Sequence, residues 1–107
     1  MDFETVEPAQ VPEDAFLVDI REQDEWDAGH APGAHHLPAS TLASNLDVFA
    51  EHDGAYLVCR SGGRSFQVAQ WLTMNGFEVI NVGGGMDGWL IQGLPIVADD
   101  GREPRII

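Results

Sequence analysis

The 107-residue chain contains no lysine, and five arginines are its only basic residues apart from four histidines. Against them stand 18 acidic residues, which give a net charge of −13. Such a charge repels a nucleic-acid duplex and an anionic membrane, so we expect neither as a partner. Ten of the acidic residues fall within residues 1–27. We interpret this run as a solvated surface, and the alternative is a docking face for a basic partner.

Long apolar runs and a second cysteine are also absent. No run approaches the roughly 20 apolar residues that span a bilayer, and the start MDFETVEPAQ lacks the basic and apolar parts of a signal peptide. Cys59 is the only cysteine and cannot form an internal disulfide, which suits a reducing compartment. We therefore expect a cytoplasmic protein, and the length predicts one domain over residues 1–107.

Short apolar segments alternate with segments of helical character. The predicted strands are Ala15–Ile20, Ala55–Cys59 and Phe77–Val82, with a further strand over Phe3–Val6. The predicted helices are Glu22–Ala28, one from a cap at Ser40 or Thr41 to His52, one from Arg64 or Ser65 to the stop at Asn75-Gly76, and Met86–Gln92. The alternation predicts an α/β fold with a mostly parallel sheet and helices on both faces. The Pro/Gly-rich tail over residues 93–107 is expected to wrap back on the domain.

The segment VCRSGGRS, residues 58–65, is the strongest candidate site. Cys59 ends the predicted central strand, and ligands of parallel sheets bind beyond the carboxyl ends of the strands. A helix predicted to begin just after the loop would lower the pKa of a nearby thiol through its free N–H groups. Gly62 and Gly63 allow successive backbone amides to turn toward an anion. These features predict a nucleophilic Cys59 in an anion-binding loop.

Several other chemistries lack the residues they need. The four histidines all precede the loop, and His35 and His36, as neighbours in an extended segment, would point to opposite sides. With one cysteine and no second ligand pattern, we expect no metal and no other cofactor. A CxxC redox centre is excluded because it needs two cysteines.

Three segments in order resemble the motifs of the rhodanese-like domain family, and in particular of its single-domain sulfurtransferases. They are FLVDIREQDEWDAGHAPGAHHLP, YLVCRSGGRS and NVGGGMDGWLIQGLPI. The resemblance covers nearly the whole chain, although the acidic first 14 residues contain little that matches. It implies a five-stranded parallel sheet flanked by helices.

The resemblance also implies roles for individual residues. Cys59 would accept the sulfur as a persulfide, and the loop amides would surround it; the loop consists of Arg60, Ser61, Gly62, Gly63 and Arg64, with Ser65 supporting the start of the helix. Asp19 and Arg21 match an Asp-x-Arg pair that is usually structural and lies near the site, with Arg21 balanced by carboxylates such as Asp19 or Glu25. Trp89 is expected to pack in the core.

The leading hypothesis is a sulfurtransferase that takes sulfur from a small anionic donor such as thiosulfate and passes it to cyanide, a thiol or a protein acceptor. Arg60 and Arg64 would hold the negative oxygens of the donor. Phosphatase or arsenate-reductase chemistry is a second hypothesis, but its loops have five residues between Cys and Arg, whereas four separate Cys59 from Arg64. A non-catalytic sulfur carrier or a regulatory binding module on the same fold is a third.

Overall fold

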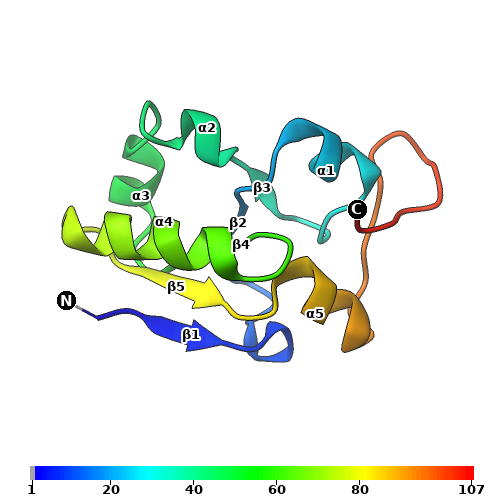
Figure 1. Cartoon of the computed structure of the whole chain (residues 1–107), viewed down its shortest axis with the longest axis horizontal. Helices are drawn as coiled ribbons and strands as arrows, with labels where there is room; N and C mark the ends of the chain where they lie inside the picture. Colours follow the sequence, from blue (N-terminus) through cyan, green and yellow to red (C-terminus); the bar gives the residue numbers. More distant parts are fainter. Residues whose placement is uncertain (1) are drawn as a thin grey trace.

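The computed structural model describes residues 2–107 and is built around a five-stranded sheet (Figure 1). The strands are β1 (Glu4–Val6), β2 (Leu17–Asp19), β3 (His35–His36), β4 (Ala55–Val58) and β5 (Val79–Val82). They lie in the order β1-β5-β4-β2-β3, and every neighbouring pair is parallel. This confirms the predicted α/β fold, and β4, which leads to Cys59, is the central strand.

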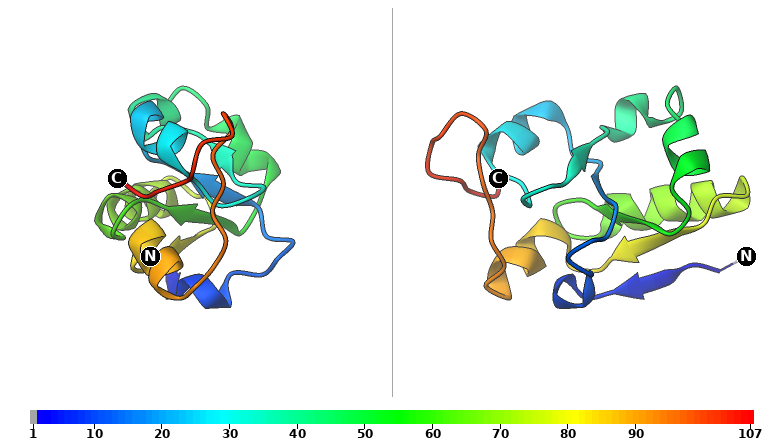
Figure 2. Two further views of the ribbon diagram at one scale, coloured as in Figure 1. Left: turned by 90° about the vertical axis from the view of Figure 1, so that its right-hand side faces the viewer. Right: turned by 180° about the vertical axis from the view of Figure 1, so that it is seen from behind.

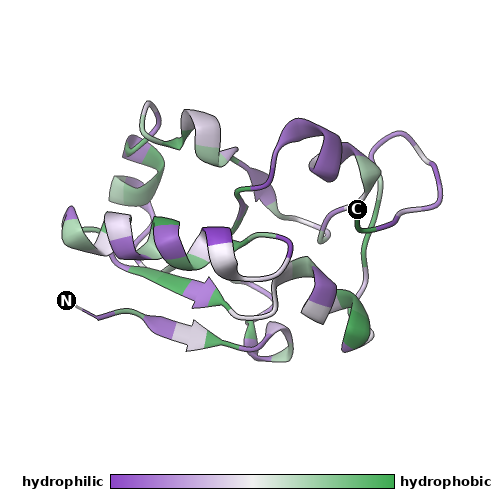
Figure 3. Ribbon diagram, in the orientation of Figure 1, coloured by the Kyte–Doolittle hydropathy of each residue, from purple (hydrophilic) through white to green (hydrophobic). Residues whose placement is uncertain are grey.

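The helices connect the strands as parallel pairing requires. They are the 3₁₀ helix η1 (Pro8–Gln10), α1 (Gln23–Ala28), α2 (Ala39–Leu42), α3 (Asp47–Glu51), α4 (Gly63–Met74) and α5 (Gly85–Ile91). Figure 3 shows α1 as mostly hydrophilic, and none of its residues is buried. Within residues 2–107, no helix has both the length and the apolar character needed to cross a membrane.

Two hydrophobic cores lie on the two faces of the sheet. One contains Leu42 of α2, Phe49 of α3 and Leu72 of α4. The other contains Met86 and Trp89 of α5. Alternate strand residues point to opposite faces, so β2, β4 and β5 each contribute to both cores. The prediction of helices on both faces is therefore confirmed, as is the burial of Trp89.

The helix predicted to extend from Ser40 or Thr41 to His52 is wrong as a single element. The chain forms α2 and α3 with a turn between them, and α2 begins after Pro38 rather than at a serine or threonine cap. The Asn45 side chain donates a hydrogen bond to the carbonyl of Thr41, 2.9 Å away. Such side-chain bonds to the backbone compete with helix continuation.

The C-terminal tail wraps back over the domain, as predicted. The backbone of Val97 pairs with that of His30, and the Arg105 amide donates to the Ala28 carbonyl at 3.0 Å. Figure 2 shows this tail running beside the segment that contains α1. The tail thus covers the end of α1 on the side of the molecule that also holds the carboxyl ends of β2 and β4.

Candidate active site

The loop after β4 makes a tight connection to α4. Cys59 directly follows the strand, and α4 begins at Gly63, one residue before the predicted start at Arg64. Gly62 precedes the helix with φ of +104°, a conformation that favours glycine. A Cβ at Gly62 would also lie 3.0 Å from the backbone nitrogen of Gly84. Both constraints explain a glycine at position 62.

The Cys59 sulfur is surrounded by hydrogen-bond donors. The backbone amide of Gly62 donates to Sγ at 3.1 Å, and that of Ser65 at 3.3 Å. The Ser65 hydroxyl lies 3.3 Å from the same sulfur. Hydrogen bonds from amides stabilise a thiolate over a thiol. Cys59 has no exposed surface, so another molecule reaches the sulfur only if part of the loop shifts.

Ser65 contacts the sulfur as well as supporting the start of the helix. Its hydroxyl lies 3.3 Å from the Gly62 carbonyl, in addition to its contact with Cys59. Ser65 is completely buried, whereas Ser61 and Gly63 are exposed on the outer side of the loop. The loop therefore has an inner side formed by the sulfur, two amides and one hydroxyl, and an outer side that faces solvent.

Arg64 forms a two-pronged ion pair with Glu25 of α1. Nη1 and Nη2 of Arg64 each lie 2.8 Å from one carboxylate oxygen of Glu25. Hydrogen bonding by Arg64 holds the pKa of Glu25 below its usual range. The same hydrogen bond raises the pKa of Arg64 further above its ordinary value. The pair connects the first turn of α4 to α1 across the edge of the site.

Arg60 lies on the opposite side of the loop and is held less firmly. Its Nε lies 3.5 Å from Oδ1 of Asp87 in α5, and 53% of the Arg60 side chain is exposed. The pair is longer and more exposed than Glu25–Arg64, of which the carboxylate is only 15% exposed. Arg60 is thus the freer of the two loop arginines.

Asp19 and Arg21 form a fully buried ion pair at the carboxyl end of β2, beside β4. Arg21 Nη2 lies 2.7 Å from Asp19 Oδ2, and Nε lies 2.9 Å from Oδ1. Nη2 also donates to the Gly29 carbonyl at 2.7 Å. Among residues 2–107, no hydrogen-bond partner is found for Nη1. Asp19 is therefore the carboxylate that balances Arg21, while Glu25 pairs with Arg64.

The sequence interpretation missed three residues that contact the loop. Glu25 and Asp87 pair with its arginines, and Gly85 packs against its backbone. The predicted last helix begins at Met86, and the glycines before it were given no role of their own. No local pattern assigns a carboxylate 39 residues away to Arg64.

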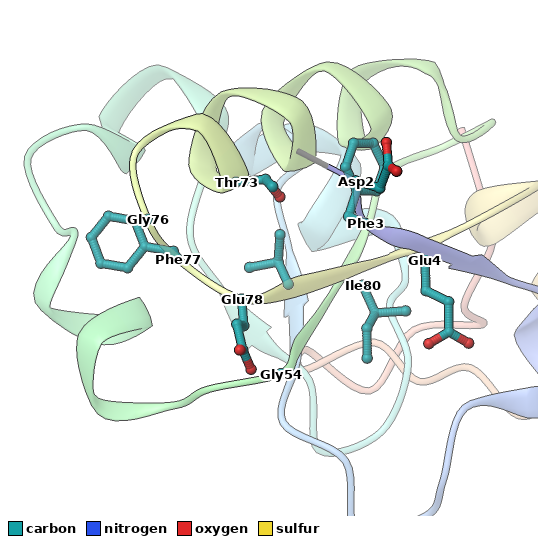
Figure 4. Close-up of a pocket in the computed structure, with 10 residues that line it drawn as sticks. Asp2, Phe3, Glu4, Gly54, Thr73, Gly76, Phe77, Glu78 and Ile80 are labelled. Carbon is teal, nitrogen blue, oxygen red and sulfur yellow. The ribbon is translucent and has the colours of Figure 1, made fainter.

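Within residues 2–107, no three His, Cys, Asp or Glu side chains are grouped closely enough to hold a metal ion, and the cavity described next lies away from the candidate site. A cavity of about 550 Å³ lies at the amino ends of β1 and β5, and Figure 4 shows Phe3, Thr73 and Phe77 among its lining residues. It is at the end of the sheet opposite Cys59, and no residue of the loop lines it.

Comparison with models of protein families identifies the family of this chain. The model of the rhodanese-like domain matches residues 6–92. The chain belongs to the rhodanese-like domain family. This match covers all five strands except Glu4 and Thr5 of β1, and all of α1–α5.

Individual relatives agree with this assignment. A protein of Allochromatium vinosum named sulfurtransferase is 38% identical over 90 residues, which are 83% of this chain and 84% of the relative. A solved structure of the Staphylococcus saprophyticus protein SSP1007 is 33% identical, with a TM-score of 0.78, and the match covers 87% of this chain and 99% of that one. A rhodanese-related protein of Thermoplasma volcanium is 23% identical with a TM-score of 0.82, covers 91% of this chain and 100% of its own, and supports the fold alone.

Proposed function

We propose that this rhodanese-like domain is a sulfurtransferase in which Cys59 carries the transferred sulfur as a persulfide. The observation that carries the proposal is the environment of Sγ, where the amides of Gly62 and Ser65 and the Ser65 hydroxyl converge on one atom. Amides directed at a sulfur favour its anionic form. A reducing compartment such as the cytoplasm suits a reaction that starts from a free thiol.

In the first half-reaction, the Cys59 thiolate attacks the outer sulfur of thiosulfate. The new S–S bond forms as the bond between the two thiosulfate sulfurs breaks, and sulfite leaves with that electron pair. Cys59 Sγ becomes neutral, the outer sulfur keeps the negative charge that it had in thiosulfate, and sulfite leaves as a dianion. Sulfite is a stable anion, so the step needs no proton donor and no metal.

In the second half-reaction, an acceptor attacks the outer sulfur and returns Cys59 to the thiolate. With cyanide the products are thiocyanate and the free enzyme, and with a thiolate the acceptor becomes a persulfide. The outer sulfur carries the charge before the attack and Cys59 carries it afterwards. The loop amides can therefore stabilise the anion in both states.

The two loop arginines would bind the negative oxygens of the donor. Within residues 2–107, the Arg60 side chain has one long ion-pair contact, with Asp87, and can turn toward a ligand at small cost. Arg64 uses Nη1 and Nη2 on Glu25, and each of these nitrogens carries a second N–H. We propose that Glu25 holds Arg64 in place while its remaining donors face the substrate.

Mass spectrometry of the intact protein after incubation with thiosulfate tests the proposal. We expect a gain of one sulfur atom, which cyanide removes with release of an equal amount of thiocyanate. Because Cys59 is the only cysteine, the gain is assigned without mapping, and Cys59→Ser should show none. A folded wild-type protein that gains no sulfur from thiosulfate or from a polysulfide would overturn the proposal.

The same preparations separate the alternatives. A sulfur carrier or binding module would gain sulfur but release thiocyanate only once or very slowly. A phosphatase would hydrolyse p-nitrophenyl phosphate, and the short loop between Cys59 and Arg64 argues against it. Repeated turnover of thiosulfate with no release of p-nitrophenol is the result expected for the proposed enzyme.

A further inference from the structure

The start of α5 makes direct backbone contact with the active-site loop. The Met86 amide donates to the Cys59 carbonyl at 2.8 Å, and the Asp87 amide donates to the Arg60 carbonyl at 2.9 Å. Both amides lie in the first turn of α5, where N–H groups have no partner within the helix. The loop carbonyls supply the missing acceptors. The two segments therefore satisfy each other's backbone groups.

These two hydrogen bonds determine which way the first peptide groups of the loop face. In a trans peptide the N–H points away from the preceding C=O, and none of the described peptide bonds is cis. Because the carbonyls of Cys59 and Arg60 point at α5, the amides of Arg60 and Ser61 point away from it. Neither amide is used by α5, and both remain available to an anion bound over the loop.

Gly85 permits this close contact. A Cβ at Gly85 would lie 2.4 Å from the Cys59 carbonyl oxygen and 2.6 Å from the carbonyl carbon and oxygen of Arg60. These are backbone atoms, which cannot rotate aside as a side chain can. Any larger residue would push the loop away from α5 and break the hydrogen bonds from Met86 and Asp87.

Gly84 provides a matched comparison. Both glycines have positive φ, +77° at Gly84 and +57° at Gly85, so an alanine is strained at either position. A Cβ at Gly84, however, would meet nothing closer than Gly88 Cα at 3.6 Å, an ordinary contact. The two positions thus share the conformational penalty and differ in the collision with the loop.

We propose that Gly85 is a positioning residue for sulfur transfer: it lets the start of α5 hold the first two loop carbonyls, so that the amides of Arg60 and Ser61 point away from α5 and stay available to the anion bound over the loop. The role rests on the proposed sulfurtransferase function. With this role, the glycine run at the start of α5 belongs to the active site, although the run lies more than 20 residues after Cys59 in the sequence.

The test compares Gly85→Ala with Gly84→Ala in the full chain. Thermal melting measures the shared backbone penalty, and the pH profile of Cys59 alkylation by iodoacetamide reports how well the loop stabilises the thiolate. We expect both variants to lose similar stability. Only Gly85→Ala should shift the alkylation profile to higher pH and reduce thiosulfate turnover, by roughly 10- to 150-fold if one hydrogen bond to a charged group is lost.

Identical alkylation profiles and turnover in the two variants would overturn the positioning role. Alkylation does not depend on sulfur transfer, so this outcome is distinct from a failure of the proposed function, in which the wild type itself gains no sulfur.

If Gly85→Ala does not fold, Asp87→Pro and Asp87→Ala replace it. Both remove the carboxylate, and only proline removes the N–H donated to Arg60. A shifted profile in the proline variant alone supports the role, and equal profiles overturn it.

Discussion

Two sets of charged side chains lie around the Cys59 loop, and they differ in their access to water. The buried pair, Asp19–Arg21, has no exposed side-chain surface. The rim pairs are partly exposed and consist of Glu25–Arg64 and Arg60–Asp87. A buried ion must keep its partner because the alternative is an unpaired charge without solvent. A rim ion can exchange its partner for water or a ligand at little cost. The buried pair is therefore expected to keep the structure of the site, and the rim arginines are expected to be able to bind another group.

Breaking the buried pair should have the largest effect on stability. Asp19→Asn leaves the Arg21 guanidinium buried without its counter-charge, and we expect a loss of about 3–5 kcal/mol in the free energy of unfolding. Urea denaturation measures this loss. Asp100→Asn is the matched control, because Asp100 pairs with Arg102 on the surface, where 46% and 85% of the two side chains are exposed. Equal losses in the two variants would contradict the distinction between buried and exposed pairs.

Removing the firmer rim arginine should affect catalysis more than stability. Arg64→Ala should raise the KM for thiosulfate roughly 10- to 150-fold, the range for losing a hydrogen bond to a charged group. It should change transfer from a preformed persulfide much less. Donor kinetics with thiosulfate and with a neutral persulfide donor measure the difference. Equal losses for both donors, together with a lowered melting point, would mean that Arg64 only braces the loop.

Glu25→Gln isolates the carboxylate of the same pair. Because the pKa of Glu25 is lowered in the folded state, its contribution to stability is present at neutral pH and is lost as the pH falls below the ordinary carboxylate range of about 4 to 4.5. The partner is 43% exposed, so we expect at most about 1 kcal/mol. Denaturation of both proteins from pH 7 to pH 3 should show a difference in the free energy of unfolding that decreases toward low pH. A difference that does not change with pH would mean that the Glu25 charge is not its cause.

The smallest effect is expected at the Arg60–Asp87 pair. Asp87→Asn retains the backbone amide that donates to Arg60 and removes only the charge. Stability should stay within about 0.5 kcal/mol of the wild type, and the KM for thiosulfate should fall by less than about threefold as Arg60 is released. Thermal melting and steady-state kinetics measure both. A larger loss of stability would place this pair with the buried one.

Local sequence patterns were sufficient for most of the fold. Apolar runs predicted β2, β4 and β5, and the end of the second run at Cys59 located the loop. The helix predicted from Ser40 or Thr41 to His52 was wrong because its apolar residues have the spacing of one helix but lie on two helices, α2 and α3. A turn separates the two helices, and in it the Asn45 side chain donates a hydrogen bond to the Thr41 carbonyl. The spacing of hydrophobic residues does not reveal such a turn.

The sequence by itself identified the cysteine that we propose as the nucleophile and the kind of loop that holds it. One cysteine, two adjacent glycines and the end of an apolar strand lie within a few residues, and local backbone geometry follows from them. The tertiary structure decided which distant groups complete the site. Glu25, Gly85 and Asp87 reach the loop only because a parallel sheet brings its connections to one edge. Those contacts depend on packing between segments far apart in the chain, which no local pattern encodes.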